Sequence, residues 1–297
     1  PITDQSAAPL NSFSFTVPAN TFDDLNGDTL SLSANLEDGE PLPDWLSFDE
    51  ATGTFSGFPT GDDLDNISIS VTADDGQGGT PAIDTFDLTV EFANTPTTTN
   101  EINGNSTNNT INGTSANDLI RGQGGNDVLT GRAGDDILNG GGGADEILGS
   151  SGNDLLTGDG GGDLLLGGTG DDILVGGGGR DTLTGGSGND ILDGGNGIDE
   201  IQGGTGDDQL FGGNGRDVLT GNGGSDQFFL IPDTGEDSIT DFEDGIDTFV
   251  LPVGITFGEL TISDNISGDA LISFNSQLLA TVENAAGLID ETDFTNV

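Results

Sequence analysis

The sequence predicts an all-β protein with three structured parts: an N-terminal β-sandwich, a parallel β-solenoid and a β-rich C-terminal end. Three observations carry this prediction. Short runs of alternating apolar and polar residues fill residues 1–95, an unbroken nine-residue repeat covers 104–229, and strand-like alternation returns over 230–297. We therefore expect domains with these bounds and a polar linker at 96–103.

The N-terminal part alternates in the manner of half-buried antiparallel strands. Residues 13–17 (FSFTV), 67–71 (ISISV) and 86–90 (FDLTV) place apolar residues on one side and polar residues on the other, which is the period of a strand with one buried face. Turns rich in Asp, Gly and Pro separate the runs at the spacing of a sandwich. Trp45, the only tryptophan, is expected to pack in the core.

The nine-residue repeat runs through fourteen units without an insertion. Its first residue is Gly in every unit, its fourth is Gly in twelve, its sixth is Asp in thirteen, and its eighth is Ile, Leu or Phe in every unit. Glycines allow the positive φ angles of a tight turn, and the last three residues form a short strand. Each repeat thus makes half a coil, and two repeats make one turn of a solenoid with two parallel sheets.

Composition excludes several kinds of chemistry. The chain has 53 Asp plus Glu, four Lys plus Arg, a formal net charge of −49, and no His or Cys. A zinc site of the usual kind, a Ser-His-Asp triad and a Cys nucleophile are therefore excluded, and nucleic acid is not an expected partner. No apolar run of ~18 residues exists, so no direct membrane insertion is expected. We expect no enzymatic activity, no catalytic residues and no organic cofactor.

The repeat needs a cation. One inward aliphatic residue per nine gives a thin core, and carboxylates stacked ~4.8 Å apart on successive rungs repel one another. A divalent ion between the turns removes this repulsion. Ca²⁺ accepts an irregular shell of carboxylate and carbonyl oxygens, so it fits better than Mg²⁺.

Units such as 167–175 (GGTGDDILV) and 185–193 (GGSGNDILD) resemble the RTX calcium-binding nonapeptide, GGxGxDxUx. The resemblance covers 104–229 and implies a β-roll in which the Asp of position six and turn carbonyls hold about eleven Ca²⁺ between coils. Asn109 departs from this pattern. The implied ligands on the first edge of the roll are Asp118, Asp136, Asp154, Asp172, Asp190, Asp208 and Asp226, and those on the second edge are Asp127, Asp145, Asp163, Asp181, Asp199 and Asp217.

The N-terminal part resembles the bacterial cadherin-like, dystroglycan-type module, an Ig-like sandwich. The likeness rests on segments such as 17–34 (VPANTFDDLNGDTLSLSA) and 41–60 (PLPDWLSFDEATGTFSGFPT). In such modules acidic clusters at the domain ends bind Ca²⁺, which implies one or more further ions here, with ordinary Asx turns as the alternative. The implied ligands are Asp24, Asn26, Asp28 and Asp75.

Residues 235–252 keep a D-x-I-x-D-F pattern and resemble the cap that closes RTX arrays. Terminal repeats of a solenoid are atypical because they cover its open core. Asp237, Asp241 and Asp247 therefore have two interpretations, as ligands of a last ion or as capping polar residues. The tail, 253–297, is similar to the C-terminal regions of RTX proteins exported by type I secretion, which makes that machinery an expected partner.

One outward row is apolar. Position seven of one sheet carries an aliphatic residue on five consecutive rungs, which fits either an interaction surface or simple β-propensity. The residues are Leu119, Ile137, Leu155, Ile173 and Ile191.

These observations favour an extracellular calcium-binding module, secreted or at the cell surface. It would fold on Ca²⁺ after export and serve as an adhesive or structural part of a longer protein, with an unidentified adhesion target. The alternative is the accessory or secretion module of an extracellular hydrolase whose catalytic domain lies upstream. An ice-binding solenoid is disfavoured, because Leu148 and Leu166 interrupt the outward row that holds Thr130 and Thr184.

Overall fold

The computed structural model covers residues 1–297 and describes all but 10–12, 24–28, 44, 60–62, 64–65, 79, 92–95, 233–234, 253 and 297. The protein is all-β, as predicted, and its described part contains no α-helix. Two 3-10 turns, η2 (Phe257–Glu259) and η3 (Glu291–Asp293), lie near the C-terminus. No described helix has the length and apolar character needed to cross a membrane.

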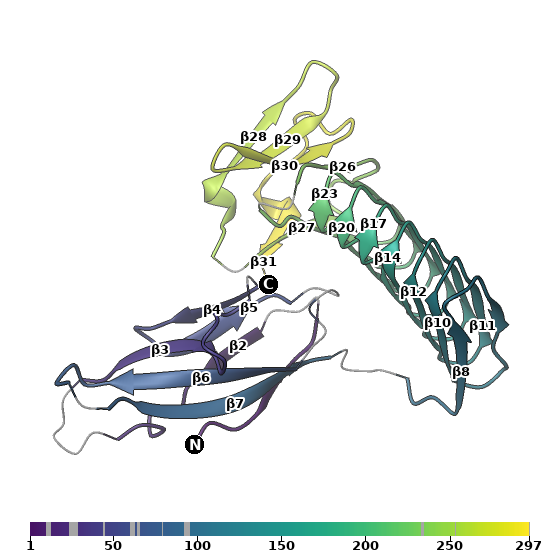
Figure 1. Ribbon diagram of the computed structural model, residues 1–297. Coiled ribbons are helices and arrows are strands. Elements are labelled where there is room, and N and C mark those ends of the chain that lie inside the picture. Colours follow the sequence, from purple (N-terminus) through teal and green to yellow (C-terminus); the bar gives the residue numbers. More distant parts are fainter. Residues whose placement is uncertain are drawn as a thin grey trace. The chain divides into compact units, whose positions relative to one another are not determined.

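The chain divides into two compact units, Pro1–Ala93 and Asn94–Val297. The first unit is a two-sheet sandwich, with strand orders β1-β7-β6-β3 and β2-β5-β4 (Figure 1). Its strands are β1 (Gln5–Ala7), β2 (Phe13–Thr16), β3 (Ser31–Leu36), β4 (Leu46–Asp49), β5 (Thr54–Gly57), β6 (Asn66–Asp74) and β7 (Ala82–Val90).

Alternation along the strands builds the core of the sandwich. Strand β6 buries Ile69 and Val71, and β7 buries Phe86. The ring of Phe55, on the second sheet, meets Phe86 edge-on with centroids 5.5 Å apart. Trp45 packs against this core while remaining partly exposed, which confirms its expected role.

The second unit is a parallel β-solenoid with two long sheets (Figure 1). One sheet contains β8 (Asn100–Asn105), β10 (Asp118–Gly124), β12 (Ile137–Gly142), β14 (Leu155–Gly161), β16 (Ile173–Val175), β17 (Gly178–Gly179), β19 (Ile191–Asp193), β20 (Asn196–Gly197), β22 (Gln209–Phe211), β23 (Asn214–Gly215), β25 (Gln227–Phe229), β27 (Thr248–Leu251) and β31 (Phe294–Asn296). The other contains β9 (Thr110–Asn112), β11 (Val128–Ala133), β13 (Glu146–Ser151), β15 (Leu164–Thr169), β18 (Thr182–Ser187), β21 (Glu200–Thr205), β24 (Val218–Gly223), β26 (Asp237–Ile239), β28 (Leu260–Asp264), β29 (Ala270–Phe274) and β30 (Gln277–Val282).

The register of the roll is the predicted eighteen residues. Leu119 pairs with Ile137, and Ile137 pairs with Leu155, so the apolar residues of position seven stack on consecutive rungs. Position eight points inward, and its residues from Ile120 to Phe228 are fully buried in one continuous core. The period of the sequence therefore sets both the sheet pairing and the core.

The roll begins before the first glycine-led repeat. Strand β8 pairs in register with β10, and Ile102 takes the inward place one coil before Ile120. Residues 100–103 are therefore part of the first sheet, which corrects their assignment to the linker 96–103. They were missed because NEIN lacks the glycine pattern and keeps only the inward aliphatic residue.

The C-terminal cap continues the roll with a changed spacing. Ser238 pairs with Val218, twenty residues earlier, and Thr248 pairs with Gln227, twenty-one residues earlier. Strand β30 then pairs with β26, and β31 pairs with β27, so the expected β-rich cap extends both sheets.

Candidate metal centre

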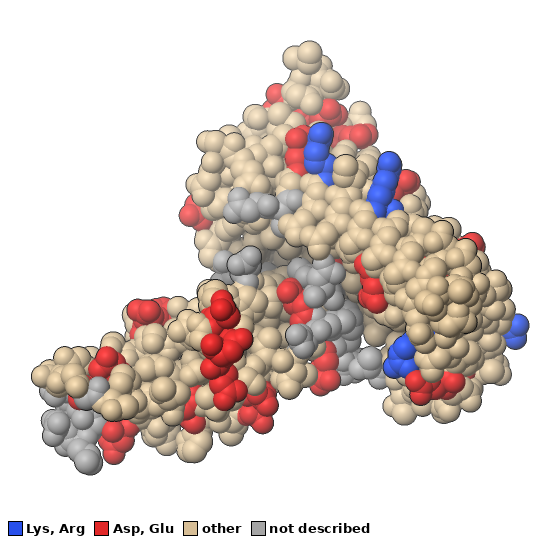
Figure 2. Space-filling view, viewed as in Figure 1, with Lys and Arg blue, Asp and Glu red and all other residues tan. Residues whose placement is uncertain are grey.

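The Asp residues of position six form a hydrogen-bonded ladder along each edge of the roll. The backbone N–H of Asp154 donates to Oδ1 of Asp172 at 2.8 Å, and that of Asp163 donates to Oδ1 of Asp181 at 2.7 Å. These side chains are 0–3% exposed from Asp118 to Asp226. In Figure 2 most of the visible roll surface is accordingly tan rather than red. The ladder shows that one carboxylate oxygen per repeat fixes the stacking of the coils.

The other oxygen, Oδ2, is left without a hydrogen-bond donor along most of both edges. A buried charged oxygen without a partner is strongly unfavourable, so its recurrence at one position of the repeat points to a bound positive charge. The residues are Asp127, Asp136, Asp145, Asp154, Asp163, Asp172, Asp190, Asp199, Asp208 and Asp217.

At most of these positions a backbone carbonyl oxygen lies close to Oδ2, in a small space beside the first glycine of the repeat that we call the cradle. A Cβ placed on Gly158 would lie 2.5 Å from Oδ2 of Asp163 and 2.6 Å from the carbonyl oxygen of Gly176, one coil later. Any residue larger than glycine would fill this space. The cradle therefore brings together a carboxylate oxygen and a carbonyl oxygen from two successive coils. No hydrogen-bond donor of the protein reaches the carboxylate oxygen there.

The pKa values of many ladder carboxyl groups are raised, as expected for buried carboxylates that have no positive charge beside them. Burial, together with the neighbouring Asp154 and Asp190 carboxylates, raises the pKa of Asp172 to about 8, against the lowering effect of the Asp154 N–H. Burial likewise raises the pKa of Asp154 and of Asp208 to about 7. Without a cation, Asp172 thus favours its protonated form at neutral pH, and Asp154 and Asp208 are divided between the protonated and charged forms.

Two family models match the two units of the chain. Residues 1–91 match a putative Ig domain, and residues 103–228 match the RTX calcium-binding nonapeptide repeat in overlapping four-copy blocks. The chain is an Ig-like domain followed by an RTX array. The Ig-like part of the N-terminal resemblance is thereby confirmed, whereas its cadherin-like type stays a prediction.

Similarity to solved structures is low. The extracellular lipase LipA from Serratia marcescens shares 22% identity over 62% of this chain and 39% of its own, with a TM-score of 0.25. A putative α-galactosidase from Bacteroides fragilis shares 22% identity over 35% of this chain and 19% of its own, with a TM-score of 0.23. The chain thus spans well under two thirds of either protein, and these scores support no conclusion. No curated protein matches the sequence.

The oxygens of the RTX roll fit the ion that the family implies. Each cradle offers carboxylate and carbonyl oxygens with no nitrogen or sulfur donor, which is the donor set of a hard cation such as Ca²⁺. Among the described residues, no group of three or more acidic side chains converges on one point. The cradles therefore depend on backbone carbonyls as much as on Asp side chains.

The first residues of the RTX array depart from the common arrangement. Both oxygens of Asp118 accept hydrogen bonds, Oδ1 from the Asn100 side chain and Oδ2 from the Thr114 N–H at 2.6 Å. Asn109 uses its Oδ1 to accept the N–H of Asn105 at 2.8 Å. The sequence could not separate Asp118 from the later ligands, because its competing donors lie outside the position-six pattern.

Most of the N-terminal ligands that the resemblance implies lie outside the described residues. Asp24, Asn26 and Asp28 fall among the residues that the structure does not describe. Asp75 is partly buried, and its Oδ1 accepts the N–H of Gln77 at 2.9 Å, which is a local Asx turn. A Ca²⁺ site in the Ig-like domain therefore stays a prediction.

One further carboxylate joins the second edge of the RTX roll beyond the repeats. Asp237 is 7% exposed, and its Oδ1 accepts the N–H of Asp217 at 3.1 Å, as in the ladder. A G-x-D at 235–237 keeps positions four to six of the repeat after a two-residue insertion. Because of that insertion, the nine-residue period alone does not place Asp237 in the ladder.

Proposed function

We propose that this chain is a calcium-dependent folding module of an extracellular protein, and that the Asp residues of position six hold the ions. The buried row of Oδ2 atoms without donors carries the proposal. It places a negative charge at nearly every half-coil and supplies no protein group to balance it. The RTX match independently indicates a calcium-binding module of the secreted type.

The ligand pattern explains how ion binding would drive folding. A cradle combines Oδ2 of one repeat with a carbonyl eighteen residues after its first glycine, so it exists only when adjacent coils are stacked. An ion that binds only the stacked state stabilises it by mass action. The RTX array would stay unfolded in the cytosol, where Ca²⁺ is scarce, and would fold outside after the chain has passed through a type I exporter.

Outside the cell, we propose an adhesive or structural role within a longer protein. The roll offers sheets fixed by a regular ladder, and the sandwich has the Ig-like architecture common in surface proteins. Both are scaffolds in which the acidic groups are used for stacking and turns.

The test is a Ca²⁺ titration of the EDTA-treated chain, followed by far-UV circular dichroism, with Mg²⁺ as the control ion. We expect a cooperative gain of β-structure with Ca²⁺ above the constant signal of the sandwich, and little change with Mg²⁺. A spectrum that is already fully β-rich in EDTA and indifferent to Ca²⁺ would overturn ion-driven folding.

A further inference from the structure

The C-terminal end of the second edge differs from the cradles before it. In the array, Gly176 and Gly194 each face one Oδ2 and one carbonyl: a Cβ on Gly194 would lie 2.8 Å from Oδ2 of Asp199 and 2.6 Å from the carbonyl of Gly212. A Cβ on Gly212 would instead lie 2.9 Å from Oδ2 of Asp217 and 2.9 Å from Oδ2 of Asp237. The last cradle of this edge thus faces two carboxylates.

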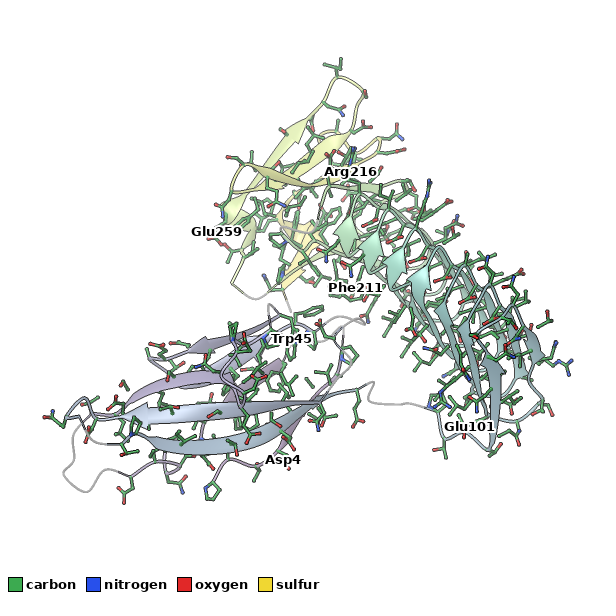
Figure 3. All side chains as sticks on the ribbon, in the orientation of Figure 1. Asp4, Trp45, Glu101, Phe211, Arg216 and Glu259 are labelled. Atoms are coloured by element: carbon green, nitrogen blue, oxygen red, sulfur yellow. The ribbon has the colours of Figure 1, made fainter. Side chains whose placement is uncertain are left out.

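The two-residue insertion after the repeats explains why a carboxylate, rather than a carbonyl, faces Asp217 in this cradle. Gly235 bridges to Gly215, and Ser238 pairs with Val218, so the next coil is stacked twenty residues on rather than eighteen. Asp237 therefore arrives at the rung above Asp217 with its Oδ1 bound to the Asp217 N–H. Its Oδ2 is then directed into the cradle. This end of the roll lies near the labelled Arg216 in Figure 3.

Both carboxylates are deeply buried. Asp217 is 1% exposed and Asp237 is 7% exposed, and Oδ2 of Asp217 has no hydrogen-bond donor. Burial and the neighbouring Asp217 charge raise the pKa of Asp237. Two buried carboxylates facing each other require either a shared proton or a cation between them.

Asp241 and Asp247, the two other acidic residues considered for a last ion, use both carboxylate oxygens as hydrogen-bond acceptors. Asp241 accepts the N–H groups of Gly221 and Asn222 at 2.9 and 2.7 Å. Asp247 accepts those of Asp226 and Glu243 at 2.9 and 2.8 Å. These two residues cap backbone groups, which separates them from Asp237.

We propose that Asp217 and Asp237 form a two-carboxylate Ca²⁺ site that closes the second edge of the roll, outside the nonapeptide array. The proposal rests on the proposed function, since it assigns the same ion to a different ligand set. Two carboxylates balance a divalent ion fully, whereas an array cradle adds one Oδ2 to a carbonyl. The end site therefore holds its ion more tightly than a single array cradle.

The first test is the number of Ca²⁺ ions bound per full-length chain, measured by native mass spectrometry at saturating Ca²⁺. Asp237→Asn keeps Oδ1 as the ladder acceptor but removes the charge, and we expect one ion fewer than in the unmodified chain. Asp247→Asn makes the same charge change at a capping residue and should retain the full number. An unchanged ion count in Asp237→Asn would overturn the proposal and leave a shared proton as the explanation.

The second test needs no variant and decides the matter if Asp237→Asn fails to fold. Crystals of the unmodified chain grown with Tb³⁺ in place of Ca²⁺ should show an anomalous peak bridging the carboxylates of Asp217 and Asp237. Filled array cradles with no peak at this point would overturn the end site alone. Empty array cradles in the folded roll would overturn the proposed function as well.

Discussion

At the residue scale, the two oxygens of one carboxylate have different roles. In Asp172, Oδ1 accepts the N–H of Asp154 and holds two coils together, whereas Oδ2 faces the cradle without a donor. An Asn at this position preserves the first role and removes the charge needed for the second. The structure thus allows ladder formation and ion binding to be separated by a single substitution.

The substitution Asp172→Asn should weaken Ca²⁺-driven folding while stabilising the metal-free roll. Losing a charged ligand costs on the order of 1.5 kcal/mol or more, which is roughly a tenfold loss of affinity for that one ion, so the Ca²⁺ midpoint should rise. Burial raises the pKa of Asp172, so removing its carboxylate relieves the metal-free roll, and the variant should keep more β-structure in EDTA than the unmodified chain. Circular dichroism under both conditions measures the two effects.

Asp171→Asn is the matched control, because it makes the same charge change one residue earlier. Asp171 is exposed, and its Oδ1 accepts the N–H of Asn189, a role that an Asn already fills at Asn153. We expect its Ca²⁺ midpoint to stay within about twofold of the unmodified chain. Equal midpoints for the two variants would argue that the charge of position six is not a ligand charge.

At the element scale, the half-coil turn is built around the space beside its first glycine. A methyl group on Gly158 would approach both Oδ2 of Asp163 and the Gly176 carbonyl more closely than carbon atoms allow. Gly160, in the same turn, has no atom within 4 Å of such a methyl group, and its φ is not in the left-handed region. Substitution by alanine should therefore have opposite consequences at these two glycines of one turn: crowding at Gly158 and none at Gly160.

Gly158→Ala should destabilise the Ca²⁺-loaded roll by about 1–3 kcal/mol, as overpacking does, and should lower the number of bound ions by one. Gly160→Ala should change stability by no more than about 0.5 kcal/mol and leave the ion number unchanged. Denaturant unfolding in saturating Ca²⁺, together with native mass spectrometry, gives both quantities. Equal effects of the two substitutions would show that the space beside Gly158 is not an ion cradle.

The sequence predicted this element well where the period carries the information, and poorly where it does not. The eighteen-residue register and the inward row through Leu138 and Leu156 follow directly from the repeat. The start of the roll at Asn100 did not, because only Ile102 keeps the pattern. The different roles of Oδ1 and Oδ2 could not be predicted from the sequence either. The N–H group that binds each carboxylate lies one coil away and becomes its neighbour only in the folded roll.

At the scale of the whole molecule, the roll gathers many carboxylates into an interior that water does not reach. Most of those beyond Asp118, whose own pKa is lowered, have a pKa that is raised with burial as the first cause, to about 6 in Asp136 and Asp190, about 7 in Asp154 and about 8 in Asp172. A shift shared by so many groups makes pH a variable of the entire fold rather than of one site.

The sign of the pH effect follows from these shifts. A carboxyl group whose pKa is higher in the folded roll than in the unfolded chain contributes its full stabilisation below the unfolded value of 3.8. That contribution is lost as the pH rises through the folded values of about 6 to 8. The metal-free roll should therefore gain stability as the pH falls from 8 to 5, which stays above the sequence pI of about 4.1.

Ca²⁺ should remove most of this dependence, because the bound ion balances the carboxylates in their charged form. Thermal unfolding at pH 5, 6, 7 and 8, with EDTA and with saturating Ca²⁺, measures the difference. We expect the roll in EDTA to lose its β-structure as the pH rises through this range, so that it is unfolded at pH 7 and 8, and the melting temperature of the Ca²⁺-loaded roll to stay nearly constant or to rise. A metal-free roll whose stability rises with pH would mean that its position-six carboxylates are solvated rather than buried, and that proton and Ca²⁺ do not compete for the same oxygens.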